Sequence, residues 1–292
     1  MSTIDEFRKE VRAWLEANCP PAMRTPTPDG ALIFGGRKLS FQSEEQQQWF
    51  ERMRDKGWFA PDWPAEYGGG GLTAEQTAVL EAEMRRIHCR PPQINLGIWM
   101  LGPVVLEFGT EEQKQALLKP MTRGEIRWCQ GFSEPNAGSD LASLRTRADR
   151  DGDDLVVNGQ KIWTTLGPGA DWMFALVRTS KAEGMAKQRG ITFLLINLKT
   201  PGVKVRPIVN LKGEGEFSEV FFDNVRVPVS NVVGRIDDGW NVANSFLREE
   251  RIFFGTPRQC EYALAQLDRL VEATSALDDA AFRDRYAQLV LD

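Results

Sequence analysis

The sequence predicts an α+β protein, in which a helical N-terminal domain is followed by a β-rich middle domain and by a second helical region. Three observations support this order. Apolar residues recur at helical spacing near the N-terminus, short β-like runs with turn signals fill the middle of the chain, and helical spacing returns at Gly239. We therefore place the domains at residues 1–125, 126–232 and 233–292.

Length and composition are those of a soluble globular protein. A chain of 292 residues suggests two or three packed units. Its hydrophobic content of 42% and charged content of 26% are ordinary, and its net charge of −5 gives no reason to expect a nucleic-acid partner. Because the chain has no apolar run of membrane-spanning length and no apolar signal core at its N-terminus, we expect no membrane span and a cytoplasmic location.

Cysteine and histidine usage argues against a metal site. The four cysteines, Cys19, Cys89, Cys129 and Cys260, are far apart in the sequence and form no Cys-x-x-Cys pair. This spacing also argues against a disulfide framework and favours a reducing compartment. The single histidine, His88, excludes a multi-histidine metal site.

The helical signals of the first domain begin with an apolar stripe that ends at Pro20-Pro21. The segment 94–108 is apolar and predicts a buried helix. The glycine run 68–71 is not a P-loop, because no Gly-Lys-Ser/Thr follows it, and we interpret it as a turn. Capping boxes predict three helix starts. The residues of the stripe are Ile4, Phe7, Val11, Trp14 and Leu15, and the capping residues are Ser43 with Gln46, Thr73 with Gln76, and Thr110 with Gln113.

The middle domain is predicted to be a small antiparallel β-domain. Asp151-Gly152 and Asn158-Gly159 read as hairpin or turn signals on either side of Leu155-Val156-Val157. Thr200-Pro201-Gly202 has the pattern of a type II turn. Further short β-like runs occupy residues 172–177, 191–197, 203–208 and 219–222.

One loop in this domain, residues 130–140, is built for a particular backbone path. Pro135 fixes its own φ, while Asn136 and Gly138 tolerate conformations that other residues avoid. The hydroxyls of Ser133 and Ser139 and the free N–H groups are donors that could hold an electron-rich ring or a carbonyl. The alternative is a tight surface turn.

Three blocks, in order, resemble the acyl-CoA dehydrogenase family: residues 130–140, residues 158–172 with Trp163-Thr164-Thr165, and residues 221–228. The resemblance extends to 64–69 and 200–202 and covers essentially the whole chain. It implies a helical N-terminal domain, a β middle domain and a C-terminal four-helix bundle. Since only about half of that bundle is present, we expect a fragment or a C-terminally shortened protein of the bacterial type.

The resemblance implies FAD as cofactor. Ser133 matches a hydroxyl that meets the pyrimidine end of the flavin, Trp163 matches a tryptophan beside the isoalloxazine, and Thr165 matches a threonine hydrogen-bonded to N5. From the residues alone, Trp163 could instead be a core residue and Thr165 a cross-strand β-branched residue. The positions that match family contacts to FAD are Gln130, Phe132, Ser133, Gly138, Ser139, Trp163, Thr164 and Thr165.

The implied reaction is α,β-dehydrogenation of an acyl-CoA thioester, with hydride transfer to flavin N5. In most of the family the base lies late in the bundle, but a minority place it before an arginine on the first bundle helix, which here is Glu250 before Arg251. Phe246 and Phe254 lie four residues either side of Glu250, on one helical face. Burial of the Glu250 carboxyl among these side chains would raise its pKa. Glu250 could equally be an ordinary helix carboxylate. Ser139 and Arg251 match positions that contact the CoA moiety.

The partners implied are the acyl-CoA substrate, electron-transfer flavoprotein, and other subunits in a homo- or hetero-oligomer. The family's Arg-x-x-Phe-Gly element is missing at residues 266–271, which argues against a symmetric homotetramer. The pattern at residues 58–69 is similar to bacterial members that pair two unlike chains, including those acting on steroid side chains. A non-catalytic partner subunit is therefore the alternative function. A hydrolase using Ser133 or Ser139 with His88 is weaker, because no Gly-x-Ser-x-Gly surrounds either serine.

Overall fold

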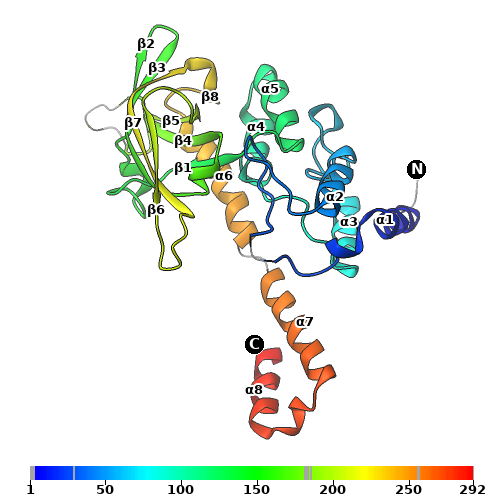
Figure 1. The fold of residues 1–292 in the computed structure, drawn as a ribbon. Coiled ribbons are helices and arrows are strands. Elements are labelled where there is room, and N and C mark those ends of the chain that lie inside the picture. Colours follow the sequence, from blue (N-terminus) through cyan, green and yellow to red (C-terminus); the bar gives the residue numbers. More distant parts are fainter. Residues whose placement is uncertain (1–3, 29, 181–183, 185, 255–256, 292) are drawn as a thin grey trace. The chain divides into compact units, whose positions relative to one another are not determined.

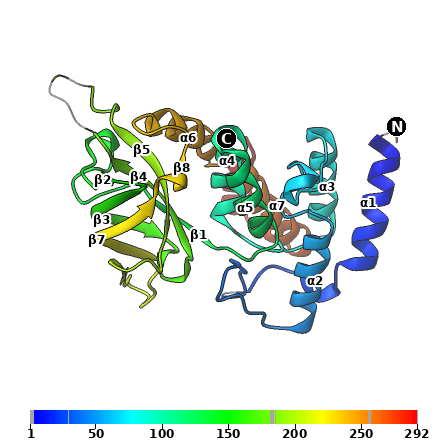
Figure 2. The same cartoon turned by 90° about the horizontal axis from the view of Figure 1, so that it is seen from above.

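The computed structural model confirms an α+β chain (Figures 1 and 2) and describes residues 4–28, 30–180, 184, 186–254 and 257–291. Side chains are described for these residues except 248–254, 258, 259 and 262. The helices are α1 (Ile4–Asn18), α2 (Glu44–Asp55), α3 (Ala74–Arg86), α4 (Gly102–Phe108), α5 (Glu111–Thr122), α6 (Gly239–Phe254), α7 (Arg258–Ala273) and α8 (Ala280–Leu291). The strands are β1 (Trp128–Gly131), β2 (Arg147–Asp151), β3 (Asp154–Thr165), β4 (Trp172–Arg178), β5 (Ile191–Asn197), β6 (Val203–Ile208), β7 (Phe217–Pro228) and β8 (Val232–Val233).

The chain forms two compact units, Met1–Phe246 and Leu247–Asp292. In the first unit, Figures 1 and 2 both place α4 and α5 between the sheet and the helices α1 to α3. The Gln113 side chain on α5 donates to the carbonyls of Ser230 and Val232, each at 2.8 Å, and so joins the helical part to the β part. The domain boundaries predicted at 125/126 and 232/233 stay a prediction.

Two of the three predicted capping boxes form. The side-chain oxygens of Thr73 and Thr110 each accept a hydrogen bond from the backbone N–H of the glutamine three residues later. The side chain of that glutamine accepts a hydrogen bond from the backbone N–H of the threonine. Ser43 caps α2, but its box is incomplete. The Gln46 side chain accepts from the backbone N–H of Gln42 at 2.8 Å and donates to the Ala31 carbonyl at 2.7 Å. Gln46 is therefore used to hold the preceding loop.

The predicted helix over 94–108 is divided. Residues Gly97–Leu101 form a π-helical turn, and α4 follows it. The glycine at the junction, Gly102, lies against Trp63, whose ring carbons would be about 2 Å from an added Cβ. A larger residue would therefore push the helix away from this indole ring. The burial predicted for the segment is confirmed at Ile98, Leu101 and Val105.

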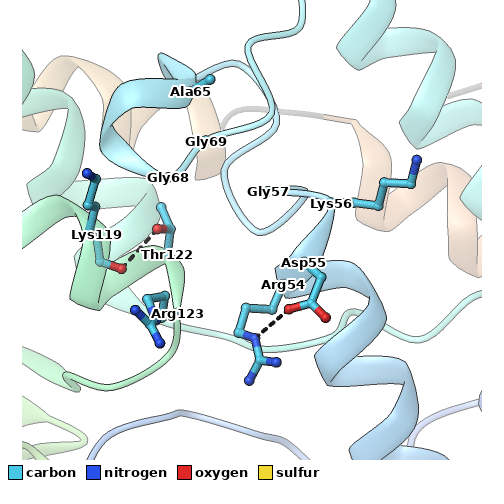
Figure 3. Close-up of a pocket in the computed structure, with 10 residues that line it drawn as sticks. All are labelled: Arg54, Asp55, Lys56, Gly57, Ala65, Gly68, Gly69, Lys119, Thr122 and Arg123. Carbon is cyan, nitrogen blue, oxygen red and sulfur yellow. Dashed lines mark hydrogen bonds and ion pairs between the residues drawn. The ribbon is translucent and has the colours of Figure 1, made fainter.

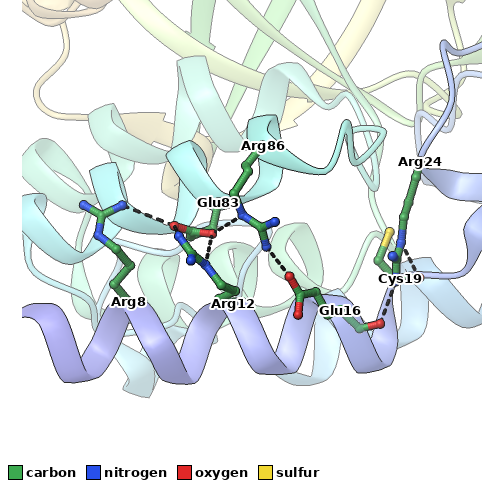
Figure 4. Close-up of polar contacts among 7 residues, drawn as sticks. All are labelled: Arg8, Arg12, Glu16, Cys19, Arg24, Glu83 and Arg86. Atoms are coloured by element: carbon green, nitrogen blue, oxygen red, sulfur yellow. Dashed lines mark hydrogen bonds and ion pairs between the residues drawn. The ribbon is translucent and has the colours of Figure 1, made fainter.

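A buried carboxylate joins α1 to α3 (Figure 4). Glu83 on α3 forms ion pairs with Arg8 at 3.3 Å, Arg12 at 3.0 Å and Arg86 at 2.6 Å, and Arg86 also pairs with Glu16 at 2.5 Å. The hydrogen bonds from Arg12 outweigh the cost of burial and, with those from Arg86 and Arg8, lower the pKa of Glu83 to about 2.

This depressed pKa predicts an acid-sensitive contribution to stability. Above its ordinary pKa of 4.5, ionised Glu83 stabilises the folded chain, and the contribution disappears as pH falls toward 2. The shift corresponds to about 3 kcal/mol, but the three arginines are between 37% and 47% exposed, so screening reduces our expectation to about 2 kcal/mol.

We expect Glu83→Gln to lower the free energy of unfolding by this amount at pH 7, measured by urea denaturation. The difference from wild type should narrow steadily between pH 5 and pH 2. Glu81→Gln, on the same helix but more exposed, is the control and should change stability by less than about 0.5 kcal/mol. A Glu83→Gln deficit that is independent of pH would contradict the ionic origin of the effect.

The β part is one eight-stranded sheet with the order β6-β7-β3-β2-β4-β5-β8, and β1 pairs with β4. Most ladders are antiparallel, as predicted, but β1 and β2 each pair with β4 in parallel. The parallel β1 places the loop that follows it at the end of the sheet where β4 also ends. One core cluster of the sheet is almost entirely aliphatic and includes Leu155, Val157, Val177, Ile196 and Val225.

One of the two predicted hairpin turns is confirmed and the other is wrong. Asp151-Gly152 joins β2 to β3, and Gly152 has a φ of +62°. Asn158-Gly159 instead lies inside β3, where the register with β7 shifts between Val157 and Gly159. Gly159 has a φ of +146°, and an added Cβ would lie 2.7 Å from the Thr146 Cα. The dipeptide therefore forms a β-bulge rather than a turn.

In the second unit, α7 and α8 are linked by a hydrogen bond from the Tyr286 hydroxyl to Asp268, at 2.7 Å. Several large apolar side chains on these helices are exposed, including Leu270 at 53% and Leu291 at 86%. None of the described helices is long and apolar enough to cross a membrane.

Candidate active site

The loop at residues 132–140 is held to β3 by a buried lysine. Lys161 is fully buried, and its Nζ donates to the Phe132 carbonyl at 3.1 Å and to a Glu134 carboxylate oxygen at 2.8 Å. The backbone N–H of Ile162 donates to the Ser133 carbonyl at 3.0 Å. These bonds bring Ser133 next to the strand segment that contains Trp163, although thirty positions separate the two in the sequence.

Glu134 is the other half of this anchor. Its carboxylate accepts from the backbone N–H of Arg145 at 2.7 Å and of Thr146 at 2.9 Å. Burial opposes its charge, but the Lys161 ammonium and these donors outweigh burial and lower the pKa of Glu134. For Lys161 burial dominates and lowers the pKa from 10.5 to about 8, with Glu134 opposing that shift. Both groups are charged at neutral pH and hold the loop as a buried ion pair.

The end of β3 turns a tryptophan out of the sheet. The register between β3 and β7 shifts between Lys161 and Thr164, and inside this bulge Trp163 has a φ of +58°. A left-handed backbone is strained for a bulky residue. Trp163 is 59% exposed, and its only described ring contact is an edge-on one with Phe217, with centroids 6.2 Å apart. Trp163 is therefore not a core residue of the β-domain.

The two threonines after Trp163 lie in different environments. Thr165 is half-buried, whereas Thr164 is buried and points into the sheet. The Thr164 Oγ1 atom has no hydrogen-bond partner among the described residues. Thr165 can share a ligand surface with Trp163, and the orphaned Thr164 hydroxyl leaves one buried polar group that a bound group or water would satisfy.

The remaining predicted loop residues divide into buried and exposed ones. Phe132 is buried against Phe174 and Phe246, with ring centroids 6.0 and 5.2 Å away. Gln130 on β1 and Ser133 are half-buried, while Gly138 and Ser139 are exposed. The space around Gly138 is open, because an added Cβ would meet nothing within 4 Å. The site therefore has an anchored inner part and an open outer part.

These features fit the FAD that the resemblance implies. A flavin needs an apolar wall and hydrogen-bond donors at its edge. The exposed indole of Trp163 supplies the first, and the hydroxyls of Ser133 and Thr165 beside it supply the second. The outer part of the loop, at Gly138 and Ser139, has room for a bulky polar group.

A cavity of about 490 Å³ lies beyond the outer part of the loop, and five of its lining residues are basic. Asp140, next to Ser139, forms an ion pair at 2.7 Å with Lys187, one of these residues. Sequence reasoning missed the cavity because its cations come from three separated segments. They are Arg145, Arg147, Arg178, Lys187 and Arg189.

A second basic cavity, of about 460 Å³, lies in the helical part (Figure 3). It is lined by the C-terminal ends of α2 and α5 and by the loop at Gly68-Gly69. Basic residues are favoured at such ends, where unpaired carbonyls carry partial negative charge. Arg54 pairs with Asp55 at 2.9 Å and Arg123 with Glu125 at 2.8 Å. These charges are explained by the helix ends, and we place no site there.

The predicted base and its neighbour lie in α6, and their side chains lie outside the described residues. This applies to Glu250, Arg251 and Phe254. Phe246, one turn before Glu250, is described and packs on Phe132 and Phe174. Among the described residues, no group of three or more His, Cys, Asp or Glu side chains could hold a metal ion.

Comparison with family models decides the family. A model described as acyl-CoA dehydrogenase, N-terminal domain, matches residues 2–125, and one described as acyl-CoA dehydrogenase, middle domain, matches residues 129–225. The chain belongs to the acyl-CoA dehydrogenase family. The predicted family, fold class and enzyme class are confirmed, and members of this family are oxidoreductases that generally use FAD.

Individual acyl-CoA dehydrogenases are similar over most of the chain. Acyl-CoA dehydrogenase IpdE1 of Mycobacterium tuberculosis is 40% identical over 288 residues, which are 98% of this chain and 73% of that protein. The ChsE4-ChsE5 complex from Mycobacterium tuberculosis matches with 30% identity and a TM-score of 0.75, covering 100% of this chain and 73% of the matched one. The Tcur3481-Tcur3483 steroid ACAD matches with 30% identity and a TM-score of 0.74, and the match covers 99% of this chain and 73% of the matched one.

Proposed function

We propose that this chain binds FAD and catalyses α,β-dehydrogenation of an acyl-CoA thioester. One observation carries the proposal: the strained β3 bulge turns the Trp163 indole outward, directly beside a loop that Lys161 and Glu134 hold in place. A strained backbone at an exposed aromatic residue adds nothing to the core. It is explained if the indole forms the wall of a ligand site.

The inner residues would hold the flavin, which supplies the hydride acceptor when it is bound. Ser133 and Thr165 would donate hydrogen bonds at its edge, and Trp163 would exclude water from one side. Gln130 and Phe132 would contribute backbone groups, and Gly138 and Ser139 would meet the phosphates of FAD. Because the Thr164 side chain points into the sheet, we propose that it supports the strand at this site.

The basic cavity supports a coenzyme A thioester as the substrate class. Coenzyme A carries a diphosphate and a further phosphate, and arginine forks bind phosphate oxygens well. Arg178 orders the wall of this cavity, since its guanidinium donates to the carbonyls of Lys187 at 3.0 Å, Arg189 at 2.6 Å and Ala142 at 2.8 Å. The other four basic residues would therefore bind the phosphates. We propose that the phosphates lie in this cavity and that Ser139 meets the pantetheine. That Arg251 contacts the CoA moiety stays a prediction from the resemblance.

A second candidate function is that of a non-catalytic partner subunit in a hetero-oligomer. The similar ChsE4-ChsE5 complex has two differently named components, and the exposed apolar residues on α7 and α8 would suit contacts with another subunit. In either role the chain would work in an oligomer. In the catalytic role, electron-transfer flavoprotein would accept the electrons.

The test is the colour of the purified chain and its bleaching. We expect a yellow protein that releases FAD on denaturation and loses its colour anaerobically with an acyl-CoA. The panel should contain straight, branched and steroid-derived acyl groups, the last because one of the similar structures is a steroid ACAD. A chain that becomes yellow only with a co-expressed neighbour, and that no acyl-CoA bleaches, would favour the partner-subunit role. Failure of FAD to bind under either condition would refute both.

Trp163→Ala gives a residue-level test of the same proposal. Because Trp163 is exposed and outside the core, the FAD-free variant should unfold at the same temperature as FAD-free wild type. We expect its Kd for FAD to rise about tenfold, the order expected for loss of an aromatic contact. Leu211→Ala is the control, since Leu211 is a fully exposed residue of the β6–β7 loop. An unchanged FAD affinity in Trp163→Ala would show that the flavin does not use this wall.

A further inference from the structure

Two cysteines that are 70 positions apart meet in the helical part. Cys19 follows α1, and Cys89 lies three residues after the end of α3. Their Sγ atoms are 3.3 Å apart, and no disulfide joins them. Cys19 is 2% exposed and Cys89 is half-buried, so solvent reaches the pair from the Cys89 side. The candidate active site uses neither residue.

The surroundings of the two sulfurs differ. The Cys89 thiol donates to the Cys19 sulfur, and this hydrogen bond lowers the pKa of Cys19 despite its burial, while the pKa of Cys89 is raised. Arg24 also lowers the pKa of Cys19. Its guanidinium donates to the Cys19 carbonyl at 3.0 and 2.7 Å, which fixes a positive charge beside the sulfur (Figure 4). The pair thus places a sulfur whose pKa is lowered in direct contact with a second thiol.

We propose that Cys19 and Cys89 are an oxidative modification site, at which hydrogen peroxide converts the thiol pair into a disulfide. The Cys19 thiolate attacks one peroxide oxygen, the O–O bond breaks, hydroxide leaves, and Cys19 becomes a sulfenic acid. The Cys89 sulfur then attacks the Cys19 sulfur. The S–S bond forms, the S–O bond breaks, and the departing hydroxyl takes the Cys89 proton as water. Peroxide gains the two electrons that the sulfurs lose.

The other two cysteines lack this arrangement. Cys129 is fully buried on β1, and burial raises its pKa. Cys260 is exposed on α7, and none of the described hydrogen bonds joins it to a second thiol. Oxidation into a disulfide within one chain is therefore expected only at the Cys19–Cys89 pair.

The disulfide would join the end of α1 to the segment after α3, two helices that the Glu83 ion pairs already hold together. A cross-link that closes so long a loop restricts the unfolded chain strongly. We expect the oxidised chain to unfold about 5 °C or more above the reduced chain, and dithiothreitol to reverse the increase.

The experiment uses the full chain with Cys260→Ser, which prevents cross-links between chains and leaves three of the four thiols. After a limited dose of hydrogen peroxide, free thiols should fall from three to one. Peptide mapping should find Cys19 linked to Cys89, and the unfolding temperature should rise. In the matched variant with Cys89→Ser, the linked peptide and the rise in unfolding temperature should both be absent.

Two results would overturn the proposal: three free thiols in the Cys260→Ser chain at a peroxide dose that oxidises Cys260 in the wild-type chain, or sulfinic acid at Cys19 without the linked peptide. Peptide mapping of the Cys260→Ser chain does not depend on how the Cys89→Ser variant folds. The result is also independent of the proposed function, because neither cofactor nor substrate is needed for any readout.

Discussion

Glu250→Gln is expected to slow the reduction of bound flavin by an acyl-CoA about a thousandfold or more, while FAD binding survives. The α-proton of a thioester is weakly acidic, so dehydrogenation needs a base at that carbon. Glutamine keeps the shape and the hydrogen-bonding reach of glutamate but cannot accept the proton. The measurement is the anaerobic rate of flavin bleaching in a stopped-flow instrument, at saturating substrate.

The position of Glu250 on α6 supports this assignment. Glu250 lies one helical turn after Phe246, whose ring is buried between Phe132 and Phe174 in the first unit. Residues four apart share a helical face, so positions 246 and 250 lie on the same side of α6. Glu249 is the matched control, because its position lies about 100° around the helix, and Glu249→Gln should bleach at nearly the wild-type rate. Wild-type bleaching by Glu250→Gln would place the base in another segment or subunit.

Local signals in the sequence predicted the elements that depend on local chemistry. The helix starts at Thr73 and Thr110 were predictable because an N-cap side chain and a glutamine three residues later bond within a single turn. The Asp151-Gly152 hairpin was predictable for the same reason. The order of the blocks that contain Ser133 and Trp163 then identified the family, and the structure brings those two blocks together.

Features that depend on distant partners were not predictable from local pattern. Asn158-Gly159 is a typical hairpin dipeptide, yet here the backbone of Thr146 passes so close that the glycine is used in a bulge. Lys161 carried no signal as an anchor, although it continues the inward-facing positions of Leu155 and Val157 on β3. A lysine at such a position needs a buried acid, and Glu134 lies 27 residues earlier, in the loop that it holds.

That anchor yields a second large effect. Lys161→Met should lower the free energy of unfolding by about 3–5 kcal/mol, because it leaves the Glu134 carboxylate buried without its cation. It should also weaken FAD binding by more than tenfold, since the Phe132 carbonyl and the Ser133 loop lose their tie to β3. Urea denaturation measures the first effect. FAD titration, well below the unfolding temperature of the variant, measures the second.

Two further variants separate charge from position. Lys204→Met, at an exposed site on β6, should alter stability by less than about 0.5 kcal/mol and leave FAD affinity unchanged. Adding Glu134→Gln to Lys161→Met removes the unpaired buried charge, so part of the lost stability should return. FAD affinity should not return, because neither new side chain replaces the hydrogen bond that the Lys161 ammonium donates to the Phe132 carbonyl. If affinity recovers together with stability, Lys161 acts on the cofactor only by keeping the sheet folded, and the loop needs no anchor of its own.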